Sequence, residues 1–271
     1  MTDAPAARPG PAVLPGPAVL AGKAVLVTGG SGQLGSAFAQ AMSAAGADVV
    51  ITGRSPDRLA KTADRIGAHT GGQVRFAAGD LTDHESLAGL AEQAWDQFGG
   101  LDVVVNSAVP DGSQIPSGDL LATPDDVWWR FFDPIVLGAL TLSRELVPRM
   151  AERGGGAFIN ITSPTGIVPS PGMDAYGLAK GALVTLTKYM AREWGRWNIR
   201  ANALSPGLIV DDQFITADSI EATPALRALL DRTSLGRPGQ AGDLTGVAVF
   251  LASDAASFIS GALIPVDGGR F

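Results

Sequence analysis

The stretch AVLVTGGSGQLGSAF, residues 24–38, joins a short apolar run to a glycine-rich turn and then to the start of a helical pattern. An unbroken apolar run is typical of a strand that is buried on both faces of a parallel sheet. The glycines of the turn would let backbone amides approach a pyrophosphate group at the positive end of the helix; they are Gly29, Gly30, Gly32 and Gly35. A tight turn without a ligand is the alternative, but the position after a first strand favours binding. The candidate dinucleotide contacts here are Thr28, Gly29, Ser31, Gly32, Gln33, Leu34 and Gly35.

The rest of the chain repeats this alternation of short apolar runs with longer helical patterns. Seven runs fit buried strands, at residues 24–28, 48–52, 74–78, 101–106, 157–162, 199–204 and 262–266. Because helices lie between them, the strands are expected to be parallel and covered on both faces. We therefore predict a single α/β domain, a Rossmann-type doubly wound seven-stranded parallel sheet with helices on both faces. Ligands of such sheets bind beyond the carboxyl ends of the strands.

Composition argues against several classes of function. The 271 residues carry a formal net charge of −7, whereas a nucleic-acid surface needs clustered Lys and Arg. No apolar run approaches the roughly 18 residues that a membrane helix requires. The chain has no Cys and two His, so disulfides, a Cys-type zinc site and a Ser-His-Asp hydrolase are poorly supported. We predict no metal site, no nucleic-acid partner and no membrane partner.

The first 20 residues differ from the rest of the chain. They contain the tandem repeat PGPAVLPGPAVL, residues 9–20, which has neither helical nor alternating periodicity. We expect a Pro/Ala-rich disordered tail over 1–20, with a docking arm as the alternative, and a folded domain over 21–271. The start of the chain does not fit a secretory signal, so the expected location is the cytoplasm.

The second strand ends in a sequence that bears on the choice of cofactor. An acidic residue at this position would bind the adenosine ribose hydroxyls and repel a 2′-phosphate, but the chain has Gly53, Arg54 and Ser55. Arg54 would attract that phosphate, so we expect NADP(H) in preference to NAD(H). The alternative is a solvated Arg54 beside a helix that has Ser55 as its N-cap and Pro56 as its first residue.

After the third strand, Asp80 and Leu81 are placed to hold the edge and face of an adenine. Asp80 could equally be only a cap of its loop.

Ser163, Tyr176 and Lys180 form a candidate catalytic set. Tyr176 and Lys180 are four residues apart, so on a helix they share one face. A phenol with a pKa near 10 is a poor catalyst at neutral pH, but a neighbouring ammonium is expected to lower the pKa of Tyr176. Tyr176 could then exchange a proton with the oxygen of a carbonyl or alcohol substrate. Ser163, at the end of its strand, would hydrogen-bond the same oxygen. An exposed helical pair is the alternative for Tyr176 and Lys180 alone.

From about residue 18 to 271 the chain resembles a classical short-chain dehydrogenase/reductase. The matching stretches are the glycine turn, Asp80-Leu81, LDVVVNSA (101–108), the Ser163/Tyr176/Lys180 set, NALSPGLI (202–209) and residues 236–269. The resemblance implies that Tyr176 is the acid and base, that Lys180 also holds the nicotinamide ribose, and that Ser163 orients the substrate. It implies further cofactor contacts at Asn106, Ser107, Ala108, Pro206, Gly207 and Ile209. It also implies homodimers or homotetramers that pair through long helices.

Three positions depart from the family pattern. The glycine turn reads T-G-x-x-G-x-x-G instead of T-G-x-x-x-G-x-G, and Val109 stands where a glycine normally follows residues 106–108. Ile135 occupies the position of the family's catalytic asparagine, whose helix kink Pro134 could supply instead. Asp133 is no simple substitute, because two residues rotate a helix by about 200°.

These observations predict an NADP(H)-dependent oxidoreductase that acts on the carbonyl or secondary alcohol of a fairly apolar small molecule. The alternative is a divergent non-redox member of the family, either a cofactor-binding sensor or a cyclase- or lyase-type enzyme. Residues 208–239 correspond to the family's mobile substrate cover. The apolar residues that suggest the pocket are Ile209, Phe214, Ile220, Leu226, Leu229, Pro164 and Met173.

Overall fold

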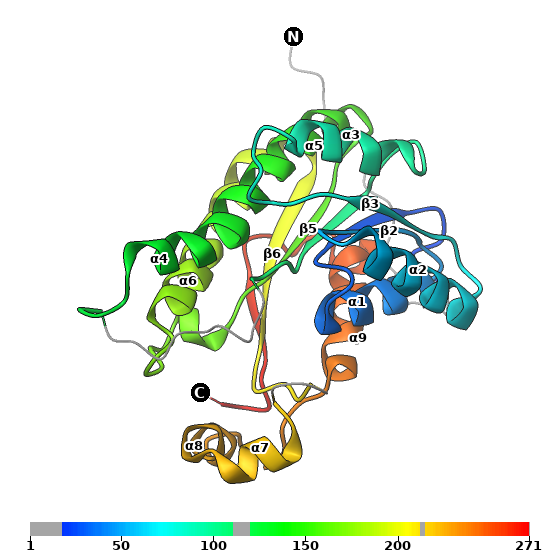
Figure 1. Ribbon diagram of the computed structural model, residues 1–271. Helices are drawn as coiled ribbons and strands as arrows, with labels where there is room; N and C mark the ends of the chain where they lie inside the picture. Colours follow the sequence, from blue (N-terminus) through cyan, green and yellow to red (C-terminus); the bar gives the residue numbers. More distant parts are fainter. Residues whose placement is uncertain (1–17, 111–119, 212–214, 271) are drawn as a thin grey trace.

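A computed structural model describes residues 18–110, 120–211 and 215–270. Seven strands form one sheet in the order β3-β2-β1-β4-β5-β6-β7, and every pair of neighbours is parallel (Figure 1). The strands are β1 (Ala24–Thr28), β2 (Asp48–Gly53), β3 (Val74–Ala78), β4 (Val103–Asn106), β5 (Gly156–Ile161), β6 (Ile199–Pro206) and β7 (Leu263–Val266). The predicted fold class is confirmed, and each predicted run overlaps one strand.

Helices connect the strands and cover both faces of the sheet. They are α1 (Gln33–Ala44), α2 (Pro56–Thr70), α3 (Leu87–Asp96), α4 (Asp125–Phe132), α5 (Ala139–Glu152), α6 (Asp174–Trp194), α7 (Ala217–Ala222), α8 (Pro224–Asp231) and α9 (Ala241–Ala252). A π-helical segment, η2 (Asp133–Gly138), joins α4 to α5, and a 3-10 turn, η3 (Pro164–Gly166), follows β5. None of the helices in the described ranges is long and apolar enough to cross a bilayer.

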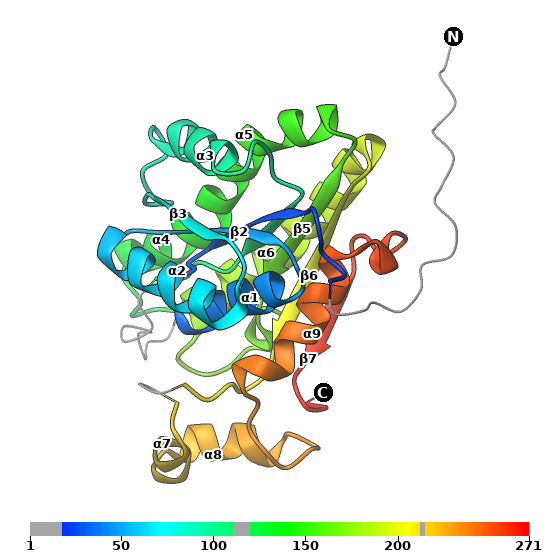
Figure 2. The ribbon, with the colours of Figure 1, turned by 90° about the vertical axis from the view of Figure 1, so that its right-hand side faces the viewer.

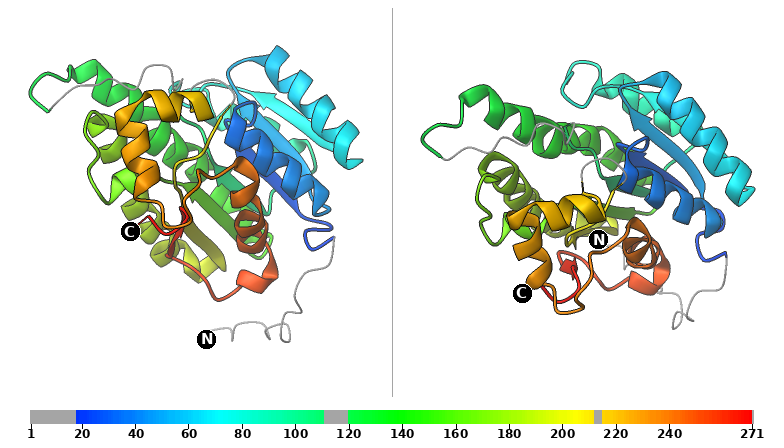
Figure 3. Two further views of the ribbon diagram at one scale, coloured as in Figure 1. Left: turned by 90° about the horizontal axis from the view of Figure 1, so that it is seen from below. Right: turned by 60° about the horizontal axis from the view of Figure 1, so that its bottom comes forward.

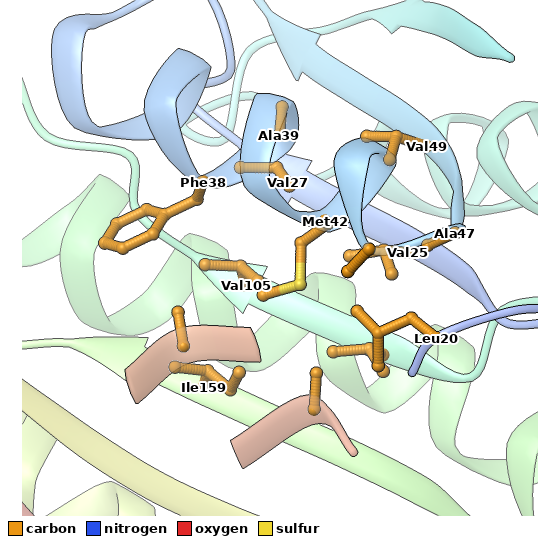
Figure 4. Close-up of a cluster of buried hydrophobic side chains, with 14 of the residues drawn as sticks. Leu20, Val25, Val27, Phe38, Ala39, Met42, Ala47, Val49, Val105 and Ile159 are labelled. Atoms are coloured by element: carbon orange, nitrogen blue, oxygen red, sulfur yellow. The ribbon is translucent and has the colours of Figure 1, made fainter. Parts of the chain in front are cut away.

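The core has two layers because successive strand residues point to opposite faces of the sheet. Val25 and Val27 pack with α1, α2 and α9, whereas Ala24 and Leu26 pack with α3, α5 and α6 (Figures 1 and 2). Figure 4 shows the first layer, in which Met42 lies among side chains of the sheet. Both faces of the central strands are therefore apolar, which is why the sequence shows unbroken runs rather than alternation.

The packed region begins before residue 21. Leu20 is fully buried in the first core layer, as Figure 4 shows, and its backbone amide donates a hydrogen bond to the carbonyl of Ala45 at 2.9 Å. Leu20, which we assigned to the tail, therefore packs with the domain next to the end of α1. The structure describes nothing of residues 1–17.

Helices α7 and α8 stand apart from the layers that cover the sheet. Figure 1 shows them below the sheet, and Figure 3 shows them from below. They belong to the segment between β6 and α9, whose two ends are joined by a bridge between Ile209 and Gly239. The amide of Gly239 donates to the carbonyl of Leu208 at 2.8 Å, and the amide of Val210 donates to that of Gly239 at 2.9 Å. Residues 208–239 therefore leave and rejoin the domain at one point.

Candidate active site

A cleft of about 1610 Å³ lies along the carboxyl ends of the strands. It is large enough for a dinucleotide with a small substrate. The predicted site residues that line it are Gly29, Ser31, Gly32, Gln33, Leu34, Gly35, Arg54, Ser55, Asp80, Leu81, Ser107, Ala108, Ser163, Tyr176, Lys180, Pro206, Gly207 and Ile209. Residues from the whole length of the domain thus meet in one cavity.

The glycine turn leaves open space at the start of α1. Gly29 has φ +66°, and a Cβ atom there would come within 2.9 Å of the Cα of Ala108. A Cβ atom on Gly35 would collide with the backbone of Gly29, so α1 can begin this close to the turn only with glycine there. The bare backbone at the N-terminus of α1 fits a pyrophosphate group.

Thr28 and Asn106 lie behind the wall of the cleft rather than in it. Thr28 is fully buried, and its Oγ1 accepts hydrogen bonds from the amides of Ser107 and Ala108 at 3.1 and 3.2 Å. The Nδ2 of Asn106 donates to the Oδ1 of Asn160 at 2.8 Å. These side chains fasten the ends of β1 and β4 to neighbouring elements. The geometry therefore does not favour direct contact between them and a cofactor.

Three arginines line the part of the cleft next to α2. Arg54 is exposed at the end of β2, and Arg58 and Arg65 follow on α2. Ser55 is the N-cap of α2, as predicted, because its hydroxyl accepts a hydrogen bond from the amide of Arg58. The guanidinium of Arg58 also donates to the carbonyl of Ser31 at 3.3 Å, which ties α2 to the glycine turn. Arg58 and Arg65 were not among the predicted site residues, although their seven-residue spacing places both on one face of a helix.

The loop after β3 provides the next part of the wall. The Oδ1 of Asp80 accepts hydrogen bonds from the amide and hydroxyl of Thr82 at 3.0 and 2.9 Å, so Asp80 caps its loop and also faces the cleft. Further along, the Nε2 of His84 lies 2.6 Å from the Oδ1 of Asp133 in η2. No sequence pattern predicts this pair, because the two residues are 49 positions apart.

The candidate catalytic residues come together from β5 and α6. Ser163 follows β5, and Tyr176 and Lys180 lie in the first two turns of α6. The turn η3 packs against α6 through glycines: a Cβ atom on Gly166 would lie 2.6 Å from the amide nitrogen of Gly181, and one on Gly177 would lie 2.8 Å from the carbonyl oxygen of Thr165. This close packing holds Ser163 beside the face of α6 that carries Tyr176.

The protonation states differ from the expectation that an ammonium lowers the pKa of Tyr176. Burial raises the pKa of Tyr176 above 10.0, and a side-chain hydrogen bond with Ser163 lowers it in part. The edge of the Phe131 ring, 6.0 Å from the Tyr176 ring between centroids, contributes to this apolar environment. Burial also lowers the pKa of Lys180 from 10.5 to about 7. The expectation was wrong for one reason. Lys180 is only 2% exposed, and the loss of water destabilises its ammonium, so burial lowers the pKa of Lys180 itself.

Ile135 and Pro134 lie in the π-helical segment η2. Ile135 is 2% exposed and packs in an apolar cluster with Ala175, Ala179 and other residues of α4 and α6. Proline lacks the amide that would continue the regular helical ladder, and a π-helical turn is one way in which a helix absorbs that loss. Asp133 pairs with His84, as noted above, so its carboxylate does not substitute for an asparagine amide at Ile135.

A family model described as enoyl-(acyl carrier protein) reductase matches residues 31–270. The chain is 38% identical over 247 residues to a protein of Mycobacterium tuberculosis that is named an uncharacterized oxidoreductase, with 90% of each chain covered. The chain belongs to the short-chain dehydrogenase/reductase family. Membership makes it an NAD(P)-dependent oxidoreductase of CH-OH and C=O groups.

Solved structures of this kind have the same fold. A short-chain type dehydrogenase/reductase from Mycobacterium ulcerans superposes with a TM-score of 0.86 at 32% identity, covering 93% of this chain and 90% of that one. A gluconate 5-dehydrogenase from Burkholderia cenocepacia, solved in complex with NADP and tartrate, gives a TM-score of 0.84 at 30% identity and covers 94% and 97%. At least one solved structure that resembles this short-chain dehydrogenase/reductase therefore contains a nicotinamide cofactor.

Proposed function

We propose that this chain is an NADP(H)-dependent enzyme that interconverts a ketone and a secondary alcohol with Ser163, Tyr176 and Lys180 as its catalytic set. The observation that carries the proposal is the convergence of these three side chains in one cleft with the glycine turn of β1 and α1. A nicotinamide cofactor supplies the hydride donor or acceptor. The side chains of this protein supply the rest of the chemistry.

The proposed work of the catalytic residues is to hold the substrate oxygen and to exchange its proton. In the reductive direction the Tyr176 hydroxyl donates a proton to that oxygen, and in the oxidative direction the phenolate removes one. Ser163 stabilises the same oxygen by a hydrogen bond. The Nζ of Lys180 donates to the carbonyl of Ile161 at 2.7 Å, which fixes its position next to the Tyr176 ring. Its low pKa makes it a group that can pass a proton near neutral pH.

The preference for NADP(H) rests on the charge around the end of β2. Arg54, Arg58 and Arg65 line the cleft there, and no carboxylate stands at position 53 or 54. A 2′-phosphate carries about 1.5 to 2 negative charges at pH 7 and favours a cationic site. Three guanidinium groups therefore support the assignment better than Arg54 alone.

An apolar substrate is supported by apolar side chains that line the cleft. Ile209 and Ile215 line it from the segment that follows β6, and Val109 lines it from the segment after β4. Arg227, the first basic residue of 208–239, is paired with Glu221 and Asp231 on its own helices. Phe214, another residue of the predicted apolar pocket, lies outside the described residues. Some relatives are named for polar substrates, such as gluconate and galactitol. Polyols are therefore the alternative substrates to test.

We also propose a cytoplasmic location and a homodimer or homotetramer, with residues 208–239 as a substrate lid. The described residues contain no group of three or more His, Cys, Asp or Glu side chains that could hold a metal ion. The mechanism proposed here needs none.

A screen with both cofactors tests the function. Purified protein is incubated with NADPH or NADH and a panel of ketones, or with NADP⁺ or NAD⁺ and a panel of secondary alcohols and polyols, and the absorbance of reduced nicotinamide is followed. We expect turnover of apolar ketones with NADPH. Tight binding of NADPH without turnover of any compound would support the sensor instead, and turnover with NADH alone would show that the arginines do not serve a phosphate.

A further inference from the structure

Ser163 does not stand alone at the end of β5. Its Oγ lies 2.8 Å from the Oγ1 of Thr165, and the geometry makes the Thr165 hydroxyl the donor and Ser163 the acceptor. The backbone amide of Thr165 donates to the same Ser163 oxygen at 3.3 Å. Both residues are buried, with 9% of each exposed. One residue therefore provides two hydrogen bonds to the Ser163 hydroxyl oxygen.

The position of Thr165 is fixed by the packing of η3. The carbonyl of Thr165 lies against Gly177, one residue after Tyr176, where a Cβ atom would come within 2.8 Å of its oxygen. The amide of Gly166 donates to the carbonyl of Ser163 at 3.0 Å, which closes the turn. Because the backbone has no room to move toward α6, the Thr165 hydroxyl stays in reach of Ser163.

The two bonds determine which way the Ser163 proton points. A serine hydroxyl has one proton and two acceptor lone pairs. When Thr165 occupies both acceptor positions, the remaining valence of Ser163 is its O-H bond, which can only donate. Ser163 also lowers the pKa of Tyr176, and in this contact Ser163 is then the donor and the phenol oxygen the acceptor.

We propose that Thr165 is a positioning residue, which keeps the Ser163 hydroxyl a donor, to the Tyr176 oxygen in the free protein and to the substrate oxygen when a substrate is bound. The proposal deepens the proposed function and rests on it for its catalytic meaning. A serine that could rotate would spend part of its time as an acceptor, and it would then compete with the substrate for the Tyr176 proton. Thr165 removes that state, and it also polarises the Ser163 O-H bond because hydrogen bonds in a chain strengthen one another.

A titration tests the hydrogen-bond direction without any substrate. The chain has two tyrosines, so Tyr189→Phe leaves Tyr176 as the only phenol. Tyr189 is 58% exposed and is not part of the cleft. In this background the tyrosinate absorbance, or the resonance of a carbon-13 label on the tyrosine ring, reports the pKa of Tyr176 directly. Circular dichroism over the same pH range checks that the fold persists during the titration.

Two replacements of Thr165 separate the hydroxyl from the shape. Thr165→Val keeps the branched side chain and removes the donor, and Thr165→Ser keeps the donor. We expect Thr165→Val to raise the pKa of Tyr176 by roughly 0.3 to 1 unit, because a weaker donor stabilises the phenolate less. Thr165→Ser is expected to leave it unchanged. An equal pKa in all three proteins would overturn the proposal, whether or not the enzyme turns over any substrate.

Kinetics extend the same comparison once the substrate screen has given a substrate. We expect Thr165→Val to lower kcat about 3- to 10-fold with little change in KM or cofactor affinity, and its alcohol oxidation to rise at a higher pH than in wild type. Thr165→Ser restores both. A loss of cofactor affinity or of thermal stability that Thr165→Ser does not rescue would mean that Thr165 only packs. If wild type has no activity, the proposed function fails, and the titration still decides the role of Thr165.

Discussion

The Nζ atom of Lys180 lies 2.7 Å from the carbonyl oxygen of Ile161, the last residue of β5. This hydrogen bond fastens the catalytic helix α6 to the strand that leads into Ser163. It also holds a basic group in a position that is 2% exposed. Folding therefore favours the neutral amine over the ammonium at this position, and this has consequences for both stability and catalysis.

Stability is expected to depend on pH through Lys180. The pKa of Lys180 falls from 10.5 in the unfolded chain to about 7 in the folded protein, so between these values the unfolded chain binds more protons. The free energy of unfolding then rises with pH, by up to about 1.4 kcal/mol per pH unit. The destabilisation caused by burying Lys180 is therefore fully present below pH 7. Urea unfolding of the cofactor-free protein at several pH values measures this slope.

Lys180→Met is the control for that slope. The difference in unfolding free energy between wild type and Lys180→Met should grow in favour of wild type as the pH rises from about 7 to about 9.5. The range stops there because Tyr176, whose pKa is raised above 10.0, makes folding less favourable at higher pH. A difference that stays constant would show that Lys180 remains charged in the folded state.

Tyr176→Phe is expected to lower turnover by about 10²- to 10⁴-fold while cofactor binding persists. The change removes the transferable proton and little volume. Tyr189→Phe is the matched control, because it makes the same chemical change at a residue that is 58% exposed, and it should keep full activity. Steady-state kinetics and cofactor fluorescence measure the two effects. Near-normal turnover in Tyr176→Phe would remove this residue from the mechanism.

Arg54→Asp is expected to move cofactor preference toward NAD(H). The aspartate replaces attraction by repulsion at the 2′-phosphate, and the loss of one charge-assisted hydrogen bond corresponds to about tenfold or more in affinity for NADPH. Arg58 and Arg65 remain in the cleft, so binding of NADPH should weaken rather than vanish. Titrations with NADPH and NADH measure the ratio of affinities.

Arg196→Asp provides the control for the change in net charge, since Arg196 is exposed and lies outside the cleft. It should leave both affinities unchanged. A wild-type protein that already prefers NADH would show that the assignment of Arg54 is wrong.

Two variants separate the effect of the missing asparagine from the effect of the proline in η2. They are Ile135→Asn and Pro134→Ala. Ile135→Asn places an amide in an apolar cluster and is expected to cost about 1–3 kcal/mol of stability, with a modest change in turnover. Pro134→Ala restores a backbone amide, which lets the helix become regular, and should reduce turnover more. Thermal unfolding and kcat of both variants test this. Strong activity that appears only in Ile135→Asn would instead mean that catalysis was lost at this position.

Local sequence patterns were enough to predict the sheet, the glycine turn and the shared helical face of Tyr176 and Lys180. These features depend on local patterns: unbroken apolar runs require a sheet that is buried on both faces, and a four-residue spacing requires one face of a helix. The N-cap role of Ser55 was predictable for the same reason, since capping involves only neighbouring residues.

Features that depend on contacts between distant segments could not be predicted from local patterns. Three such features join residues that no sequence spacing connects. They are the pair of His84 and Asp133, the hydrogen bond between Gly239 and Leu208, and the packing of the buried Leu20. The protonation of Lys180 belongs to the same class. Its sequence position suggested an ammonium that activates Tyr176, but the free energy of a charge depends on how much water the surrounding fold removes, and only the packing of α4, β5 and α6 sets that.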